Sequence, residues 1–488
     1  MIEIKKNLAQ SLDVVKELLY SDTFVVNGGA DFLAGKKIKL EKEKNQFKIS
    51  FQLIGDDRKY YNDILDAQIK DYKAKNESGN IFHFPGRFTL LTSIKELNDE
   101  WDFEVSGSVS QIITTDLKNF DDKFHRVIIP VDVSQKLSFR DYQHWWYKAD
   151  IKAKNCHLIK ITIKDSNFDL YTFQIEDKVF WGIDSFQICT FRIFQEIAFS
   201  ILNTFGFIEG DLHLNEAYYI ACDSDKFDEK LDLFYTSMRE SILTGYSIIT
   251  SNPYSVLVPL AKNKGEKINH DEIKKWYEKL PLFPADLLSK LAEFFQEHDS
   301  LSRAALIVLE ANKQPLELKA ASYCVAYEAI CHTIKNELGI RSPNVIETKS
   351  WDDIIKPAFL ELITTLNKES KIDANQFRIL SNKLNNLNQP TNRDALTAPF
   401  KNFGYELNSI EYGCIDDRNR FLHGKLPVNE RNEDEAFKEL YFISMTIHKL
   451  IYVLMLKLIS YNGYIINYPK LHEHMTGKVL NENVLVKI

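Results

Sequence analysis

The sequence contains few cysteines, and none of them are spaced as a metal-binding or redox pair. Six cysteines are scattered over 488 residues, without a C-x-x-C motif. A disulfide framework is therefore not expected, and isolated thiols in a chain of this length indicate a reducing cytoplasm. The first 280 residues also lack a glycine-rich phosphate loop, a metal-ligand triad and a nucleophile elbow, so no common enzyme motif is found there.

An excess of positive charge and a membrane-length apolar run are missing as well. The formal net charge is −8 and the pI is about 5.9, which excludes broad nucleic-acid binding through overall charge but leaves room for a local basic site. The start of the chain carries Glu3 and no long apolar run, unlike a signal peptide. The run Leu450–Ile459 is too short to cross a membrane, and Lys449 and Lys457 interrupt the apolar stretch. We expect a soluble cytoplasmic protein with no membrane partner.

Apolar and aromatic residues are plentiful. Hydrophobic residues make up 44% of the chain, with 32 phenylalanines and 22 tyrosines. This composition is typical of soluble globular domains with large cores, and the length predicts two or three domains.

The first half, residues 1–280, shows the alternation of half-buried strands. Apolar residues recur at every second position from Phe47 to Leu53, from Trp101 to Val105 and from Ile159 to Ile163. We predict a β-rich regulatory or sensing region with room for two subdomains. Further expected elements are a helix at 8–19, strands at 168–175 and 179–183, a helix at 190–203 ended by Gly206, a helix at 226–238 and a strand at 246–260.

The second half changes to the three-and-four spacing of helices. A charged segment at 262–267 and a proline-bearing segment at 280–284 mark the expected domain boundary. The helical domain should cover 285–465, followed by a tail at 466–488. Helices are expected at 285–298, 300–312, 315–337, 351–366 with a break near Pro357, 371–387, 397–410, 414–423 and 432–460, with a loop at 388–397. The fold class is thus α+β and multidomain, with a β-rich N-terminal half and an all-α helical bundle.

The segment from Cys414 to Gly424 concentrates the chemically active side chains of the chain. Asn419 and His423 are four residues apart and share a helix face. Arg418 and His423 are five apart, so on a straight helix they point about 140° from each other. The long arginine side chain, a frayed last turn or a second subunit must close that gap. Gly424 suits a helix C-terminal cap.

A guanidinium near an imidazole suits RNA cleavage. The imidazole can move a proton at a ribose or leaving oxygen, and the guanidinium can steady the phosphate charge, without a metal ion. The competing interpretation is that Arg418, Asn419 and His423 are capping and surface residues at a helix end. Glu328 falls in the apolar stripe of the helix after Pro315 and is either paired with Arg418 or at the edge of the stripe, reaching solvent.

Other candidate sites are weaker. His270 and Asp271 resemble part of a metal phosphohydrolase site, but the remaining ligands are absent and Asp271 is better explained as a helix N-cap. The aromatic group Tyr142 to Tyr147 is core or a ligand platform. His448 is expected in a core or seam, and His472 with His474, alternating as in a strand, is weak evidence for a metal site.

The last 180 or so residues resemble the HEPN superfamily, and within it the Apea-like HEPN group of bacterial defence proteins. The resemblance is carried by Arg418-Asn419-Arg420-Phe421-Leu422-His423-Gly424, which fits that family's motif of an arginine, a gap of four to six residues and a histidine. An earlier helix containing Tyr323 to Ile330, a later long apolar helix and the segment Tyr461 to Asn467 follow the same order.

The resemblance implies a helical bundle that forms a homodimer or higher homo-oligomer and cleaves RNA endonucleolytically in antiviral defence or abortive infection. It implies that Arg418 and His423 form the catalytic pair, with Asn419 as a positioning residue, no cofactor and no metal ion. Asp417 and Glu328 are added as supporting residues from their places in the sequence. An activating ligand or phage component is left unidentified. The alternative is a non-catalytic HEPN interaction or dimerisation module joined to a ligand-binding β-rich domain.

Overall fold

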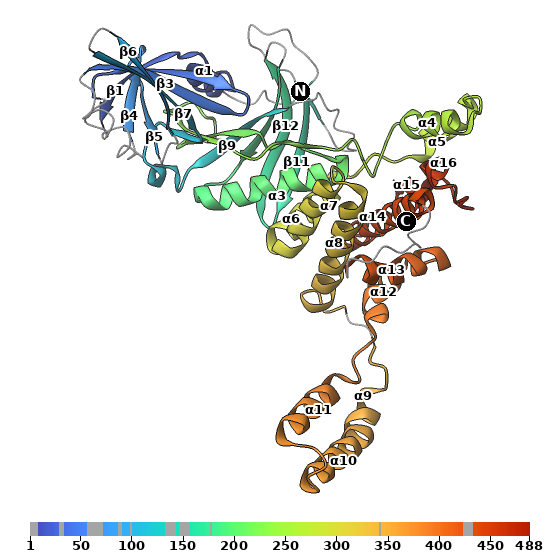
Figure 1. The fold of residues 1–488 in the computed structure, drawn as a ribbon. Helices are drawn as coiled ribbons and strands as arrows, with labels where there is room; N and C mark the ends of the chain where they lie inside the picture. The colour runs from blue at the N-terminus through green and yellow to red at the C-terminus, as the bar shows by residue number, and fades with distance from the viewer. Residues whose placement is uncertain are drawn as a thin grey trace. The chain divides into compact units, whose positions relative to one another are not determined.

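The fold has a β-rich N-terminal half followed by a helical C-terminal half, which confirms the predicted fold class (Figure 1). The computed structural model describes residues 8–28, 34–55, 72–85, 90–97, 100–131, 143–145, 156–175, 178–340, 343–422 and 433–488. The chain divides into two compact units, each made of two stretches of sequence. The first unit is Met1–Ser251 with Pro281–Glu297, and the second is Asn252–Leu280 with His298–Ile488.

This division differs from the single boundary expected between residues 262 and 284. Helix α6 (Ala285–Glu297) packs on α3 and β11 of the first unit. Helices α4 (Tyr254–Lys264) and α5 (His270–Lys279) belong to the second unit instead. Trp276 of α5 packs edge-on against Tyr464, with ring centroids 5.2 Å apart. The chain therefore leaves the first unit and returns to it once.

The first unit is built on one antiparallel sheet. Among the described residues its strands hydrogen-bond in the order β10-β11-β12-β13-β9-β15-β16-β8-β5-β4-β1-β2-β3-β7-β6. The strands are β1 Thr23–Gly28, β2 Lys37–Glu43, β3 Gln46–Gly55, β4 Tyr72–Asn76, β5 Ile81–Phe84, β6 Leu90–Leu97, β7 Glu100–Val109, β8 Gln111–Ile113, β9 Phe124–Val131, β10 Gln143–Trp145, β11 Cys156–Ile163, β12 Ser166–Ile175, β13 Lys178–Ser185, β15 Glu216–Cys222 and β16 Asp232–Ser237. The strands expected from alternation lie within β3, β7, β11, β12 and β13. A separate short pair joins β14 (Asp211–Leu212) to β17 (Ile242–Leu243).

Helix α1 (Leu8–Tyr20) shares one core with strands from both ends of this sheet. Its apolar residues recur at three and four positions, and Leu8, Leu12, Val15 and Leu18 are all buried. The same core contains side chains from early strands and from late strands. These include Phe24, Phe47, Val105, Tyr171, Phe180, Tyr218 and Tyr235. The sheet therefore packs around α1.

Helix α3 (Phe191–Glu209) packs on the residues of the same strands that alternate away from α1. Trp181 of β13 meets Phe205 of α3 edge-on at 4.1 Å between ring centroids. Thr190 caps the start of α3, and Gly210, with φ 81°, ends it. The expected end at Gly206 was wrong. Gly206 lies inside the helix, where a Cβ would come within 2.8 Å of Leu212 Cβ, so glycine is needed there for close packing.

Two sequence assignments in the first half were wrong in type. The expected helix at 226–238 is strand β16, and the expected strand at 246–260 contains α4. Strand β16 lies between two other strands and its first four residues are all buried. Strict alternation of apolar and polar residues is therefore lost there. Helix α4 begins directly after Pro253, a residue that suits a helix start because it has no N–H to satisfy.

The second unit is helical, and its two longest helices, α8 and α14, pack on each other. After α4 and α5 its helices are α7 Asp299–Ala311, α8 Leu316–Asn336, α9 Thr348–Ser350, α10 Lys356–Lys368, α11 Ala374–Asn386, α12 Asn392–Asn402, α13 Ser409–Leu422, α14 Glu433–Leu458, α15 Tyr468–Leu471 and α16 Glu473–Thr476. Strand β18 (Tyr464–Ile466) pairs with β19 (Leu485–Lys487), so the expected tail is folded within this unit.

Helix α14 corrects the expectation that its apolar segment is too short for a membrane. Among the described residues it is the one helix long and apolar enough to pass that test, over Asp434–Leu458. However, 94% of the apolar window is buried inside the protein. Such burial is that of a core helix in a soluble protein.

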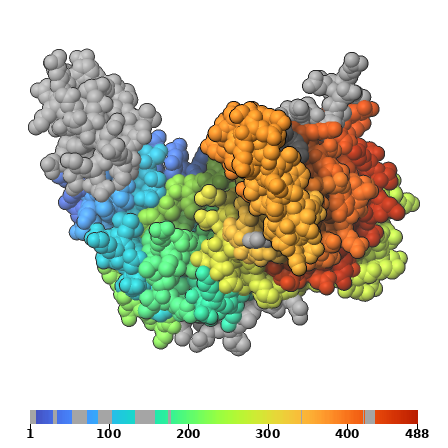
Figure 2. Space-filling view, turned by 90° about the horizontal axis from the view of Figure 1, so that it is seen from below, coloured from blue at the N-terminus to red at the C-terminus, as the bar shows by residue number. Residues whose placement is uncertain are grey.

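Helices α10 and α11 have a small core of their own. A π-helical turn, Trp351–Ile355, leads into α10, and Pro357 stands in the first turn of α10, which agrees with the expected restart there. Trp351, Ile363 and Leu384 are buried together. These helices form the orange surface in Figure 2. They also carry exposed apolar side chains, among them Phe359, Leu360 and Ile379. The loop expected at 388–397 is shorter, because Thr391 caps α12 at Asn392.

A buried ion pair joins the sheet to α1. Arg126 of β9 donates from Nε and Nη2 to the two carboxylate oxygens of Asp184 on β13, at 2.9 and 2.8 Å. Its Nη1 donates to Ser11 Oγ on α1 at 2.8 Å. Tyr171 Oη donates to Asp184 Oδ1, also at 2.8 Å. With both charges inside the core, each partner is needed to offset the desolvation of the other.

Asp184→Asn should destabilise the first unit by about 3–5 kcal/mol, because it leaves the Arg126 guanidinium buried without a carboxylate. The free energy of unfolding in urea measures this change. The matched control is Glu196→Gln, which breaks the exposed Arg192–Glu196 pair of α3 and should cost less than about 1 kcal/mol. Equal losses in the two variants would contradict the role given to the Arg126–Asp184 pair.

Candidate functional site

Helix α13 carries the arginine of the motif on its core-facing side. The helix starts at Ser409, five residues before the expected start, and is described to Leu422. Its buried residues are Glu411, Cys414, Ile415, Arg418 and Phe421. They recur at three and four positions and form one stripe. Two of these five stripe residues are charged, which is unusual for a buried helix face and requires a partner for each charge.

Arg418 finds its partner on α8. Its Nε lies 3.1 Å from Glu328 Oε1, and the arginine side chain is 2% exposed while that of Glu328 is 38% exposed. Both interpretations of Glu328 therefore hold, since it stands at the solvent edge of its stripe and pairs with Arg418. The carboxylate offsets the charge of the buried guanidinium between α8 and α13.

Thiols and a phenol of α8 surround the same guanidinium. Burial raises the pKa of Cys324 and of Cys331 to about 12, although the Arg418 charge opposes this shift. These thiols are therefore protonated at neutral pH, which makes them poor nucleophiles. Tyr327 Oη donates to the Leu396 carbonyl at 2.7 Å, which ties α8 to α12. Cys324, Cys331 and Tyr327 thus place buried, neutral side chains beside the Arg418 charge.

The other residues of the predicted site are placed only in part. Asp417 pairs with Arg420 at 3.4 Å on the exposed side of α13, away from the buried stripe. Burial raises the pKa of the Asp417 carboxyl, against the effect of Arg420. Asn419 lies in α13, one residue after Arg418, and its side chain is not among those described. His423 lies outside the described residues.

A second charged cluster, which we call the Lys449 cluster, fixes the start of α13 and was missed from the sequence. Lys449 of α14 lies 2.8 Å from Glu411 Oε1 and 3.2 Å from Glu482 Oε2. Tyr405 Oη donates to Glu411 Oε1 at 2.8 Å. Asn467 Nδ2 donates to Glu482 Oε2 at 2.7 Å. Lys449 had been read only as an interruption of an apolar run, yet a lysine in such a run is itself a signal for a buried partner.

The histidines of α14 and the tail form an aromatic cluster. His448 is buried among the rings of Tyr323, Tyr452 and Tyr468, which agrees with the core position expected for it. Tyr441 Oη lies 2.8 Å from His472 Nδ1. His472 and His474 lie at the start of the short helix α16 and within it, and not in the expected strand. Among the described residues, no group of histidine, cysteine and carboxylate side chains could hold a metal ion.

The remaining candidates are explained by local structure. Asn269, and not Asp271 as expected, is the N-cap of α5, because its side chain accepts from Glu272 N at 3.1 Å. His270 and Asp271 are the first residues of that helix. Of the aromatic group at 142–147, the described part is the backbone of β10, which pairs with β11. The rest of that group lies outside the described residues.

Comparison of the chain with known protein families, with curated proteins and with solved structures gave no match. The assignment of roles therefore depends on the motif and on the geometry of the second unit.

Acidification should destabilise the second unit through its buried histidines. Burial lowers the pKa of His448 to about 3 and that of His472 to about 4. The unfolded chain takes up these protons near pH ~6.5. Because the folded pKa values are depressed, their contribution to stability is complete above pH ~6.5 and is lost as the pH falls toward the folded values. Each histidine should cost about 2 kcal/mol at pH ~5 relative to pH ~7.

The measurement is the free energy of unfolding between pH ~7 and pH ~5. His448→Phe keeps the aromatic packing and should flatten the pH dependence. His270→Ala, which alters an exposed histidine of the same unit, should leave it unchanged. A pH dependence equally steep in all three proteins would show that these buried rings do not cause it.

Proposed function

We propose that the second unit is a metal-independent endoribonuclease of the HEPN type. In the proposed reaction the 2′-oxygen of a ribose attacks the adjacent phosphorus, and the bond to the 5′-oxygen of the next nucleotide breaks. The products are a 2′,3′-cyclic phosphate and a 5′-hydroxyl end. His423 takes the proton from the attacking 2′-oxygen and gives a proton to the leaving 5′-oxygen. Arg418 stabilises the charge on the phosphate. Asn419 orients the substrate or the histidine.

The observation that carries this proposal is the pair between Arg418 and Glu328. A guanidinium is always charged and offers several donors in a fixed plane, so a second side chain is needed to hold it in one orientation. Glu328 supplies that hold from a neighbouring helix at 3.1 Å. Arg418 lies near the end of α13, five residues before His423, in the order of the motif.

A second copy of the chain is part of the proposal. Arg418 is on the core-facing side of α13, and on a straight helix a residue five positions later points about 140° away from it. Two motifs from two subunits could supply the guanidinium and the imidazole to one phosphodiester. We therefore propose a homodimer, with RNA as substrate and the cytoplasm as location. The first unit would restrain or trigger the nuclease during infection.

One observation favours the second candidate function, a non-catalytic interaction module. The Arg418 side chain is 2% exposed in a single chain, so a substrate phosphate cannot reach it without movement of α8 or α13. In that case the pair with Glu328 stabilises the bundle, and the helical unit only binds a partner.

Loss of either motif residue should abolish RNA cleavage. His423→Ala should lower the cleavage rate by about 10²–10⁴-fold, the usual contribution of a general acid–base group. Arg418→Lys keeps the buried charge but loses the planar set of donors, so a comparable loss is expected. The assay incubates the full chain with cellular RNA in excess EDTA and sequences the new ends, testing for cyclic phosphates.

Two matched variants control for charge and for histidine content. Arg303→Ala removes an exposed arginine of α7, and His332→Ala removes an exposed histidine of α8. Both should cut RNA as the wild type does. Cleavage retained by His423→Ala and by Arg418→Lys would contradict the nuclease proposal, and no cleavage by the folded wild type would favour the interaction module.

A further inference from the structure

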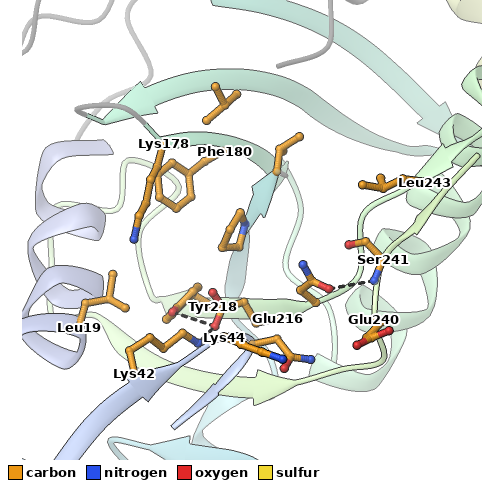
Figure 3. A pocket seen from close by; sticks show the side chains of 15 residues that line it. Leu19, Lys42, Lys44, Lys178, Phe180, Glu216, Tyr218, Glu240, Ser241 and Leu243 are labelled. Atoms are coloured by element: carbon orange, nitrogen blue, oxygen red, sulfur yellow. Dashed lines mark hydrogen bonds and ion pairs between the residues drawn. The ribbon is translucent and has the colours of Figure 1, made fainter. Parts of the chain in front are cut away.

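A cavity in the first unit has the lining of a small-molecule site. Its volume is about 520 Å³, within the range of about 300–1,000 Å³ that is usual for ligand pockets. The lining side chains come from α1, the β2–β3 turn, β9, β13, β15 and the segment before β17 (Figure 3). All of them belong to the same compact unit. The cavity is therefore enclosed by a sheet and a helix that are distant in sequence.

The floor of the cavity is an ordered polar cluster. Lys42 Nζ contacts Glu216 Oε2, and Tyr218 Oη donates to the same oxygen at 3.2 Å. Tyr235 Oη accepts from Lys42 Nζ at 3.2 Å and donates to the Asn45 carbonyl at 3.0 Å. Glu216 is 7% exposed. These contacts fix the position of the β2–β3 turn, and with it Lys44, at the edge of the cavity.

Two further lysines line the cavity and have no carboxylate in contact among the described residues. Lys44 and Lys178 are exposed at its edge. Burial lowers the pKa of Lys42 to about 7, and the positive charge of Lys178 contributes to this shift. Ammonium groups that repel one another around a hollow favour an anion between them. The cavity therefore has a cationic side.

The opposite side supplies acceptors and apolar contact. Figure 3 shows Glu240, Ser241 and Leu243 across the cavity from Leu19 and Lys178. Asn215 Oδ1 accepts from Ser241 N at 2.8 Å, so this wall is held in place. Phe180 lines the cavity on the other side, beside Lys178, and is almost fully buried. A ligand that fits must have an anionic group at one end and, at the other, a part that packs on apolar side chains and donates hydrogen bonds to Glu240.

The backbone at Lys44 is that of a tight turn. Lys44 has φ 53°, in the left-handed region, where glycine or asparagine is favoured. Glu43 and Gln46 pair across this two-residue turn. Lys164, in the two-residue turn between β11 and β12, has the same φ. The turn therefore places Lys44 at the edge of the cavity, and the case for a ligand depends on the lining side chains.

We propose that this cavity binds a nucleoside monophosphate. The phosphate lies between Lys44 and Lys178, and the base packs on Leu243 with its donors toward Glu240. The inference is independent of the proposed nuclease activity, which concerns the other unit. A polymer is disfavoured, because the volume matches one small molecule.

The test is isothermal titration of the full chain with AMP, GMP, CMP and UMP, and with inorganic phosphate and adenosine as separate probes. At least one monophosphate should bind saturably and about tenfold or more tightly than phosphate or adenosine alone. Lys44→Ala with Lys178→Ala should weaken that binding at least about tenfold, because two charge contacts are lost. The matched control, Lys118→Ala with Lys160→Ala, removes two exposed lysines of the same unit outside the cavity and should bind as the wild type does.

Two single variants separate the effect of the space inside the cavity from the effect of its charge. Leu243→Trp fills the hollow without changing charge and should abolish binding. Lys44→Gly should weaken binding and, without ligand, raise the thermal midpoint by about 2 °C, because it relieves the strained backbone. The proposal is overturned if no monophosphate saturates, if phosphate binds as tightly as the nucleotides, or if the Lys44 and Lys178 double variant binds as the wild type does.

Discussion

The buried charges on the core side of α13 are the constraint on which the helical unit depends. Glu411 and Arg418 are seven residues apart, about two turns, and are 2% exposed each. Lys449 of α14 pairs with the first, and Glu328 of α8 pairs with the second. Each partner comes from a different helix, so α13 fits only one position between them. An apolar stripe on α13 would be buried equally well, but it would allow α13 to slide along its neighbours. Paired charges are costly to bury in any other register, because each charge would lose its partner.

The first unit uses the same device in a sheet. Arg126 and Asp184 stand on adjacent strands, directly opposite each other, and Ser11 Oγ of α1 accepts a hydrogen bond from Arg126 Nη1. The pair therefore sets the position of the helix within the core that the sheet forms around it. In both units a core of aromatic and aliphatic side chains supplies most of the burial, and buried ion pairs decide how the elements fit together.

The sequence predicted most of the helices and the division into a β-rich half and a helical half. The stripe of α8 and the alternation of β3 and β11 are local patterns, and they are read correctly because each element has one buried face. Strand β16 is buried between two neighbouring strands, so its sequence shows no alternation of apolar and polar residues. It was therefore predicted as a helix. The pairing of Arg418 with Glu328 could be anticipated from a carboxylate in an apolar stripe. The Lys449 cluster could not, because its members lie on α13, α14 and the tail, and spacing within one helix does not reveal partners on another.

Under the proposed function, the Arg418–Glu328 pair also limits when the site can act. A phosphate and the Glu328 carboxylate compete for one guanidinium, and the carboxylate already holds it at 3.1 Å. Because Glu328 is 38% exposed, the approach to Arg418 runs along its side chain at the edge of the bundle. A substrate must therefore share or displace Glu328, and a small shift of α8 against α13 would change how easily it does so. The contact that orders the arginine is thus also the contact that can keep the nuclease inactive, and any signal that moves either helix would act on this pair first.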